Sequence, residues 1–168
     1  MNPDGSASEP VRLEVEVLND MIDNRESVDP YDLNRFVEAQ EVNYSGALSE
    51  LRAGHKRSHW MWYVFPQIAG LGYSAMSARY SIRSEDEARA YLAHPVLGPR
   101  LVECAEAILG VKNLSALEIM GSPDDLKLKS SATLFAHISA GGSVFHRILD
   151  TFYSSEPDLR TLQLLGRI

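Results

Sequence analysis

The stretch GSPDDLKLKSSATLF, residues 121–135, decides the fold class because it carries several signals of a helix start. Ser122 is a favoured N-cap residue, and the proline after it suits the first turn of a helix. The next two residues are aspartates, which the positive end of the helix dipole favours. This stretch therefore predicts a helix that runs to about His137.

Helical signals continue on both sides of this stretch. Capping boxes begin at Ser84 and Ser115, and Ser143 and Asp158 are suited to cap two further helices. Residues at helical spacing, most of them apolar, form three helix faces: Leu33, Phe36, Val37 and Gln40; Tyr44, Leu48 and Leu51; and Leu97, Leu101, Cys104, Ala105 and Ile108. No segment alternates polar and apolar residues as a half-buried strand does, and no internal repeat is present. We therefore expect an all-α fold, a single compact multihelical domain over residues 31–168.

The N-terminal 30 residues differ from the rest of the chain. They contain eight acids and two bases, a net charge of −6 of the chain's −7, so residues 31–168 carry only −1. Residues 1–10 are small, polar and proline-containing, which predicts disorder. Apolar residues recur at helical spacing over residues 11–22. We expect an acidic, partly disordered leader with a short amphipathic helix.

Composition excludes several classes of protein. The 168 residues are 45% hydrophobic, enough for one domain with a core, but no run approaches the roughly 18 apolar residues of a membrane helix. The N-terminus lacks the basic and apolar segments of a secretory signal. One cysteine excludes a disulfide framework, and a nearly neutral domain argues against general nucleic-acid binding. We expect a cytoplasmic protein that does not contact membranes.

Three blocks resemble a known bacterial family. They are KRSHWMWYVFPQIAGLG (56–72), YLAHPVLGPRL (91–101) and GSPDDLKLKSSATLF (121–135), and the segment YDLNRFVEAQ (31–40) matches the start of the same family. The family is called domain of unknown function 1810, and its members are sometimes labelled calpastatin-like. The resemblance spans roughly residues 31–165 and implies a compact multihelical domain. It implies no activity, and the acidic leader lies outside it.

The block at residues 56–67 predicts an anion site. Ser58 is a good N-cap, and Pro66 ends the helix that would begin there. Lys56 and Arg57 then lie at the positive end of this helix, where the dipole disfavours cations. A bound anion would relieve that conflict and would meet the free N–H groups of the first turn.

Five residues of the block are candidates for specific roles in such a site. Arg57 is suited to grip a phosphate or carboxylate bidentately, with Lys56 as a point charge. His59 would form a hydrogen bond or transfer a proton, Trp62 would form an apolar wall, and Gln67 would assist recognition. In the alternative interpretation the aromatic residues are core, and the two cations pair with acids such as those after Pro123.

A second polar stretch supplies two more candidates. Lys127 and Ser130 share a helix face with Ser131, and a desolvated lysine beside a serine can activate its hydroxyl. The alternative is a solvated lysine face on which small serines allow another helix to approach closely. We expect Lys127 and Ser130 to face the anion site from the opposite side, which requires the two stretches to meet in space.

Other motifs in the sequence are weaker evidence for a function. GLGYSA (70–75) has the spacing of a dinucleotide-binding loop but lacks the preceding strand, so we expect a turn. His55 lies outside the helix that would carry His59, which leaves no metal pair, and Cys104 on an apolar face is expected to be an inert core thiol. His94 and His146 are expected to be structural.

We therefore expect a helical domain that binds a small anionic metabolite, phosphate-bearing or nucleotide-like, without a metal or another cofactor. The pattern assigns no reaction and identifies no protein partner. The alternative is a non-catalytic protein–protein interaction module that uses the acidic leader.

Overall fold

The computed structural model describes residues 28–168, and the chain divides into two units, Met1–Asp32 and Leu33–Ile168. Residues 1–27 of the predicted leader, with the amphipathic helix expected over 11–22, lie outside the described residues. Within the described part there are nine helices and no strand beyond an isolated parallel bridge between Ile68 and Ile82. The prediction of an all-α domain is confirmed.

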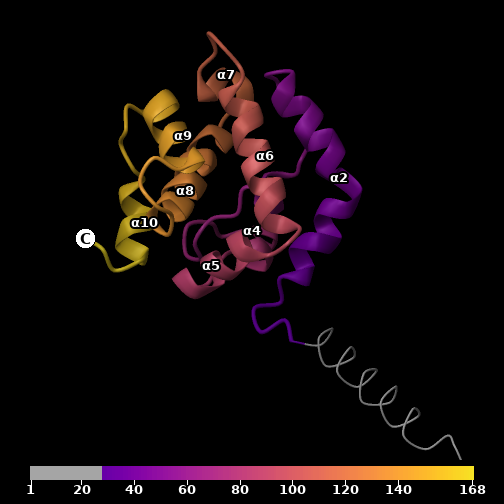
Figure 1. Cartoon of the computed structure of the whole chain (residues 1–168), viewed down its shortest axis with the longest axis vertical. Helices are drawn as coiled ribbons and strands as arrows, with labels where there is room; N and C mark the ends of the chain where they lie inside the picture. The colour runs from indigo at the N-terminus through magenta and orange to yellow at the C-terminus, as the bar shows by residue number, and fades with distance from the viewer. Residues whose placement is uncertain (1–27) are drawn as a thin grey trace, which may run out of the picture. The chain divides into compact units, whose positions relative to one another are not determined.

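The helices follow one another with short connections (Figure 1). In chain order they are α2 (Asn34–Arg52), α3 (Met61–Val64), α4 (Ala75–Tyr80), α5 (Glu85–Ala93), α6 (Leu97–Leu109), α7 (Ala116–Met120), α8 (Asp124–His137), α9 (Val144–Tyr153) and α10 (Leu159–Leu164). None of the helices in residues 28–168 combines the length and apolar composition that a membrane crossing requires.

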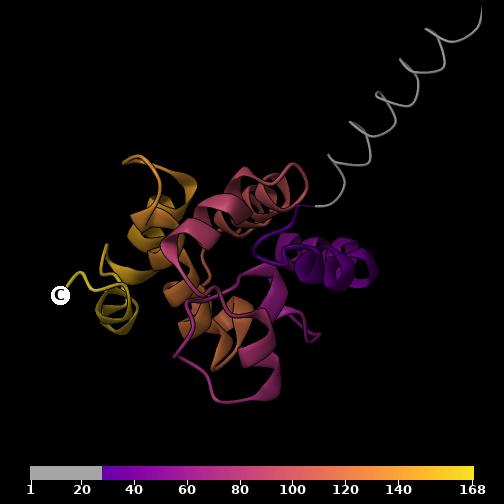
Figure 2. The ribbon, with the colours of Figure 1, turned by 90° about the horizontal axis from the view of Figure 1, so that it is seen from below.

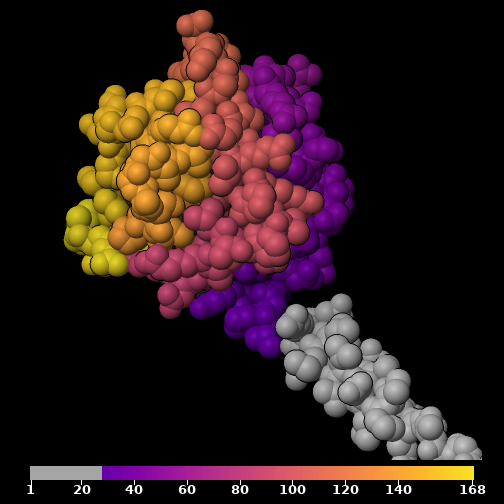
Figure 3. Space-filling view, viewed as in Figure 1, coloured from indigo at the N-terminus to yellow at the C-terminus, as the bar shows by residue number. Residues whose placement is uncertain are grey.

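Helices α6 and α8 organise the packing. Helix α6 lies beside α2 and also contacts α5 and α9, so in the space-filling view it runs between the indigo α2 and the orange α9 (Figure 3). Helix α8 contacts α5, α7, α9 and α10 and is surrounded by them in the view from below (Figure 2). The long helix α2 thus covers one side of the core, and the C-terminal helices cover the other.

The core is aromatic where these layers meet. Phe36 of α2 lies 5.0 Å from Tyr91 of α5, and Tyr91 lies 5.5 Å from Phe135 of α8, measured between ring centroids. All three side chains are fully buried. Such contacts add to the hydrophobic stabilisation from burial. The apolar face predicted for α6 is buried as well, from Leu97 to Ile108.

Most helix starts follow the sequence. Ser84, Ser115, Ser143 and Asp158 each accept a hydrogen bond from the backbone N–H three residues later. Ser122 does not cap α8, because Pro123 occupies the N-cap position and makes no side-chain hydrogen bond. The two faces expected near the start of the domain belong to one 19-residue helix, α2.

Candidate functional site

The loop between α2 and α3 corrects the predicted helix at Ser58. Helix α3 has only four residues, and its N-cap is Trp60, which makes no side-chain capping bond. The Ser58 hydroxyl donates a hydrogen bond to Glu50 Oε1 instead. The prediction that Ser58 caps a helix is therefore wrong, and so is its consequence, a set of free helical N–H groups at that position.

Glu50 takes the place predicted for an external anion. Its Oε2 accepts hydrogen bonds from the backbone N of Arg57 at 2.9 Å, the backbone N of Ser58 at 3.2 Å and Nε1 of Trp60 at 2.8 Å. Desolvation opposes ionisation of this carboxyl, but the hydrogen bonds from Ser58, Arg57 and Trp60 outweigh it and lower the pKa of Glu50 to about 2. The donors of this loop thus already hold a carboxylate of the same chain.

The two polar stretches do meet in space, at Asp124. Its Oδ2 lies 2.8 Å from Nζ of Lys56, and its Oδ1 lies 3.6 Å from Nζ of Lys127. Lys56 also lies over the ring of Trp60, and Lys127 lies over the ring of Trp62, 5.3 Å from its centroid. The convergence on which the predicted site depends is present, and so is the pairing of Lys56 with Asp124 that the alternative interpretation expects.

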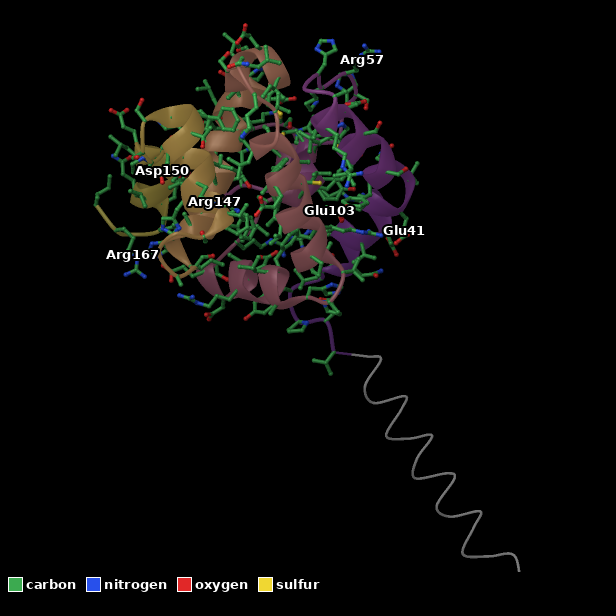
Figure 4. The ribbon with its side chains drawn as sticks, turned by 45° about the horizontal axis from the view of Figure 1, so that its top comes forward. Glu41, Arg57, Glu103, Arg147, Asp150 and Arg167 are labelled. Atoms are coloured by element: carbon green, nitrogen blue, oxygen red, sulfur yellow. The ribbon has the colours of Figure 1, made fainter. Side chains whose placement is uncertain are left out.

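Three predicted residues lie apart from this junction. Arg57 and His59 are exposed, and within residues 28–168 their side chains form no ion pair or hydrogen bond. Figure 4 shows Arg57 at the outer edge of the domain. Ser130 serves the packing of α8 on α10, because its hydroxyl contacts Leu126 O at 3.1 Å and Asp158 Oδ2 at 3.2 Å.

A cavity of about 260 Å³ opens beside Trp62. The lining residues come from α3, the loop after it, α4 and the segment that follows α4: Trp62, Gln67, Ile68, Ala69, Gly70, Leu71, Gly72, Ser77, Ala78, Tyr80, Ser81 and Arg83. Two of the predicted residues, Trp62 and Gln67, are among them. The cavity, rather than the 56–59 loop, is where predicted site residues border an open volume.

The lining hydroxyls of Ser77 and Ser81 are hydrogen-bonded within and after α4, but three other polar side chains of the lining lack internal partners in residues 28–168. Within the described residues, the Gln67 amide, the Tyr80 hydroxyl and the Arg83 guanidinium make no hydrogen bond or ion pair. The lining residues include no carboxylate. Two further cations lie over rings of the lining, Arg79 over Tyr80 at 5.5 Å and Lys127 over Trp62. The cavity is thus electropositive in a domain whose overall charge is close to neutral.

A buried ion pair fixes the wall that carries Arg83. Nη2 of Arg35 lies 2.6 Å from Oε1 of Glu87, and the other carboxylate oxygen accepts the backbone N–H of Arg83 at 2.8 Å. Arg35 also donates to the carbonyls of Arg79 and Ser81, each at 2.9 Å. The pair therefore holds the backbone at both ends of the segment 79–83.

The glycine loop forms another part of the cavity lining, next to the segment 79–83. Its Ala69 N–H donates to the carbonyl of Ile82 at 2.7 Å. Gly70 has a φ of +102°, a conformation that residues with a side chain rarely adopt, and a Cβ on Gly72 would come within 2.4 Å of Ser77 Oγ. As predicted, these glycines form a turn, and no strand precedes them within the described residues.

Sequence reasoning missed Tyr80 and Arg83. Arg83 directly precedes the cap of α5, a position where periodicity does not define the direction of the side chain. Only the parallel bridge between Ile68 and Ile82 brings the segment of Arg83 beside the segment of Gln67. The available hint was the glycine loop directly after the aromatic block.

Two other hollows are weaker candidates. One, of about 560 Å³, borders α9 and the loop after α6, and one of about 770 Å³ lies between α6 and α9. Both include Arg147, which pairs with Glu106, and Asp150 in the first accepts a hydrogen bond from Ser155 at 2.7 Å. Figure 4 shows Arg147 and Asp150 together on α9. Arg147 is already paired with an acid, and Asp150 already accepts a hydrogen bond.

The remaining singled-out residues have structural surroundings. Cys104 is buried, and desolvation raises the pKa of its thiol to about 12. His94 Nδ1 accepts from the backbone N of Val96 and Leu97 at the start of α6, and Nδ1 of His146 lies 2.7 Å from the Ser143 hydroxyl. In residues 28–168 no three His, Cys, Asp or Glu side chains group as metal ligands would.

Fold and site together define a class, a small all-α domain with an electropositive cavity beside a tryptophan. The chain belongs to the family described as Protein of unknown function (DUF1810), whose pattern matches residues 30–165. It is similar to the crystal structure of the conserved hypothetical protein Rv1873 from Mycobacterium tuberculosis, with 51% identity and a TM-score of 0.81. That match covers 82% of this chain and 99% of the other. Among curated proteins, none matches this chain.

Proposed function

We propose that this protein binds a small anionic metabolite, phosphate-bearing or nucleotide-like, in the cavity beside Trp62. The observation that carries the proposal is the convergence of three unpartnered polar side chains, Gln67, Tyr80 and Arg83, on a volume walled by an aromatic ring. A cavity with a few convergent polar groups is the usual form of a small-molecule site. The cytoplasmic location expected from the sequence is part of the proposal.

The lining suggests how a ligand would be held. A planar group stacks on the indole of Trp62, and the Gln67 amide supplies one donor pair and one acceptor for its edge. The Arg83 guanidinium is a planar fork suited to a phosphate or carboxylate. A volume of about 260 Å³ suits one ring system with one anionic group and is small for a dinucleotide.

The site residues predicted from the sequence lie in two parts of the structure, the cavity beside Trp62 and the 55–60 loop. Trp62 and Gln67 line the cavity, Lys127 lies over the ring of Trp62, and Lys56 reaches Lys127 only through Asp124. Arg57 and His59 belong to the 55–60 loop, where the backbone donors are engaged by Glu50. This division supports the cavity as the ligand site, and variants can separate the two places.

Thermal unfolding with a panel of nucleoside monophosphates, sugar phosphates and aryl carboxylates tests the proposal. A ligand at 100 times its Kd adds about 2.7 kcal/mol of stability, which raises Tm on the order of 5–10 °C in a domain of this size. We expect Arg83→Gln to abolish the rise. Arg160→Gln should preserve it, because Arg160 is exposed on α10 and lines none of the three hollows.

Two outcomes would contradict the cavity assignment. One is a panel in which no anion raises Tm. The other is a stabilising ligand whose effect survives Arg83→Gln but disappears with Arg57→Gln, which would move the site to the 55–60 loop. Quenching of tryptophan fluorescence that persists in Trp62→Phe, where only the buried Trp60 remains, would also place the ligand elsewhere.

A further inference from the structure

The carboxylate of Asp124 is shared unequally by two lysines. Lys56 is anchored: its side chain is only 6% exposed, lies 2.8 Å from Oδ2, donates to Ser58 O and covers the ring of Trp60. Lys127 lies 3.6 Å from Oδ1, beyond hydrogen-bond distance, and is 24% exposed. Asp124 is therefore committed to Lys56 and holds Lys127 only loosely.

Lys127 also contacts a residue of the cavity wall. Its ammonium lies 5.3 Å from the centroid of the Trp62 ring, and Trp62 lines the cavity. Within the described residues no second carboxylate pairs with Lys127. A lysine ammonium on a flexible four-carbon stem changes partners at little steric cost. The two lysines and the carboxylate of Asp124 together have a net charge of +1 beside Trp62.

The charges around the cavity set a preference for its occupant. Arg83 within the lining compensates one negative charge, and Tyr80 and Gln67 are neutral. A singly charged group needs no more than Arg83, whereas a doubly charged group gains from a second cation. Two cations lie over rings of the lining, Arg79 over Tyr80 and Lys127 over Trp62, and Lys127 is the one over the aromatic wall on which a planar ligand would stack.

Resting on the proposed function, we propose that Lys127 is a specificity-determining residue that turns from Asp124 to the ligand and selects doubly charged phosphate monoesters. Singly charged groups of the same shape bind without it. The ligand class is therefore an aryl or nucleoside phosphate monoester rather than a sulfate ester or a monocarboxylate.

Phenyl phosphate and phenyl sulfate are matched probes for this selection. They share ring and shape, but phosphate monoesters carry two charges above their second pKa near 6, whereas the sulfate carries one. Isothermal titration calorimetry at pH 7.5 should give the wild-type chain at least a tenfold preference for phenyl phosphate. Lys127→Gln should remove that preference while leaving the Kd for phenyl sulfate within twofold.

The control and the pH dependence sharpen the test. Lys129→Gln removes a lysine from the same helix that lies over Tyr153 instead, and it should keep the full preference. At pH 5 the phosphate carries one charge, so the wild-type preference should fade, and Lys127→Gln should show no such change between the two pH values.

The outcomes distinguish this inference from the proposed function. Equal affinities of the wild-type chain for both probes, or an equal loss for both in Lys127→Gln, would overturn the role of Lys127 and leave the cavity as the ligand site. Failure of both probes to bind, together with an empty metabolite panel, would overturn both.

Discussion

Arg35 and Glu87 are 52 residues apart in sequence, yet Nη2 of the arginine lies 2.6 Å from Oε1 of the glutamate in the interior of the domain. Their side chains are 5% and 2% exposed. The pair joins α2 to α5, and through Arg83 N–H and the carbonyl of Ser81 it also fixes one wall of the Trp62 cavity. A single buried contact thus connects the packing of the core with the shape of the candidate site.

Removing the cation of this pair should lower the free energy of unfolding substantially. Arg35→Met leaves the Glu87 carboxylate buried beside an apolar side chain, and breaking a buried pair in this way costs about 3–5 kcal/mol. Arg89→Met on α5 breaks only a surface contact with Glu85 at 3.3 Å, so its cost should stay below about 1 kcal/mol. Urea unfolding of both variants measures the difference, and similar losses would contradict the structural importance of the buried pair.

Glu50 predicts a specific dependence of stability on pH. Its pKa is about 2 in the folded chain, below the ordinary value of 4.5, so the ionised carboxylate stabilises the fold above about pH 5. That contribution is lost as the pH falls from about 5 towards 2. Glu50→Gln should therefore be less stable than the wild-type chain by about 1–3 kcal/mol at pH 7. This difference in unfolding free energy between the two chains should become smaller as the pH is lowered.

Chemical unfolding of wild type and Glu50→Gln at several pH values between 7 and 2.5 measures this gap. Glu156→Gln removes an exposed carboxylate and supplies a matched baseline. A gap that is constant over the whole range would show that the ionised form of Glu50 does not stabilise the loop.

Two glycines should respond to alanine in opposite directions. A Cβ on Gly98 would lie 2.0 Å from the carbonyl oxygen of Leu92, so Gly98→Ala forces α5 and α6 apart and costs about 1–3 kcal/mol. Gly46 lies inside α2 with no heavy atom within 4 Å of a built Cβ, so Gly46→Ala should add about 0.5–1 kcal/mol. Calorimetric Tm values should fall in the first variant and rise in the second; two shifts of the same sign would contradict the packing at Leu92.

Local signals were sufficient for much of the fold. These signals act within one or two helical turns: Ser115 forms the predicted capping box, and the apolar face of α6 is buried as predicted. Ser84 caps α5 but forms no full capping box, because the Glu87 carboxylate accepts from the Arg83 N–H instead.

Ser58 caps no helix, because the group that takes its hydrogen bonds, Glu50, lies eight residues earlier on the preceding helix and reaches Ser58 only through the turn between them. The loop after α2 turns at Gly54, with a φ of +69°, and brings Glu50 to the donors that a helix start would have left free.

In the candidate site, too, the residues within one sequence block could be predicted, and the pairing between separate loops could not. The block at residues 56–67 contained Trp62 and Gln67, and its expected meeting with Lys127 is present because Asp124 lies between the two lysines. Arg83 could not be predicted, since its place in the same cavity lining as Gln67 depends on a backbone bridge between segments without strand periodicity. The spacing of apolar residues predicts which side chains share a helix face. It does not predict which loops pair, because loops pair through backbone hydrogen bonds.

The surroundings of Cys104 make this chain convenient for labelling. It is the only thiol in the sequence, it is buried, and at neutral pH its raised pKa leaves almost no thiolate to react. A cysteine introduced at Tyr73, a side chain that is 99% exposed beside the glycine loop, would therefore react alone with a maleimide dye. The native cysteine need not be removed, and the dye would report directly on the rim of the cavity.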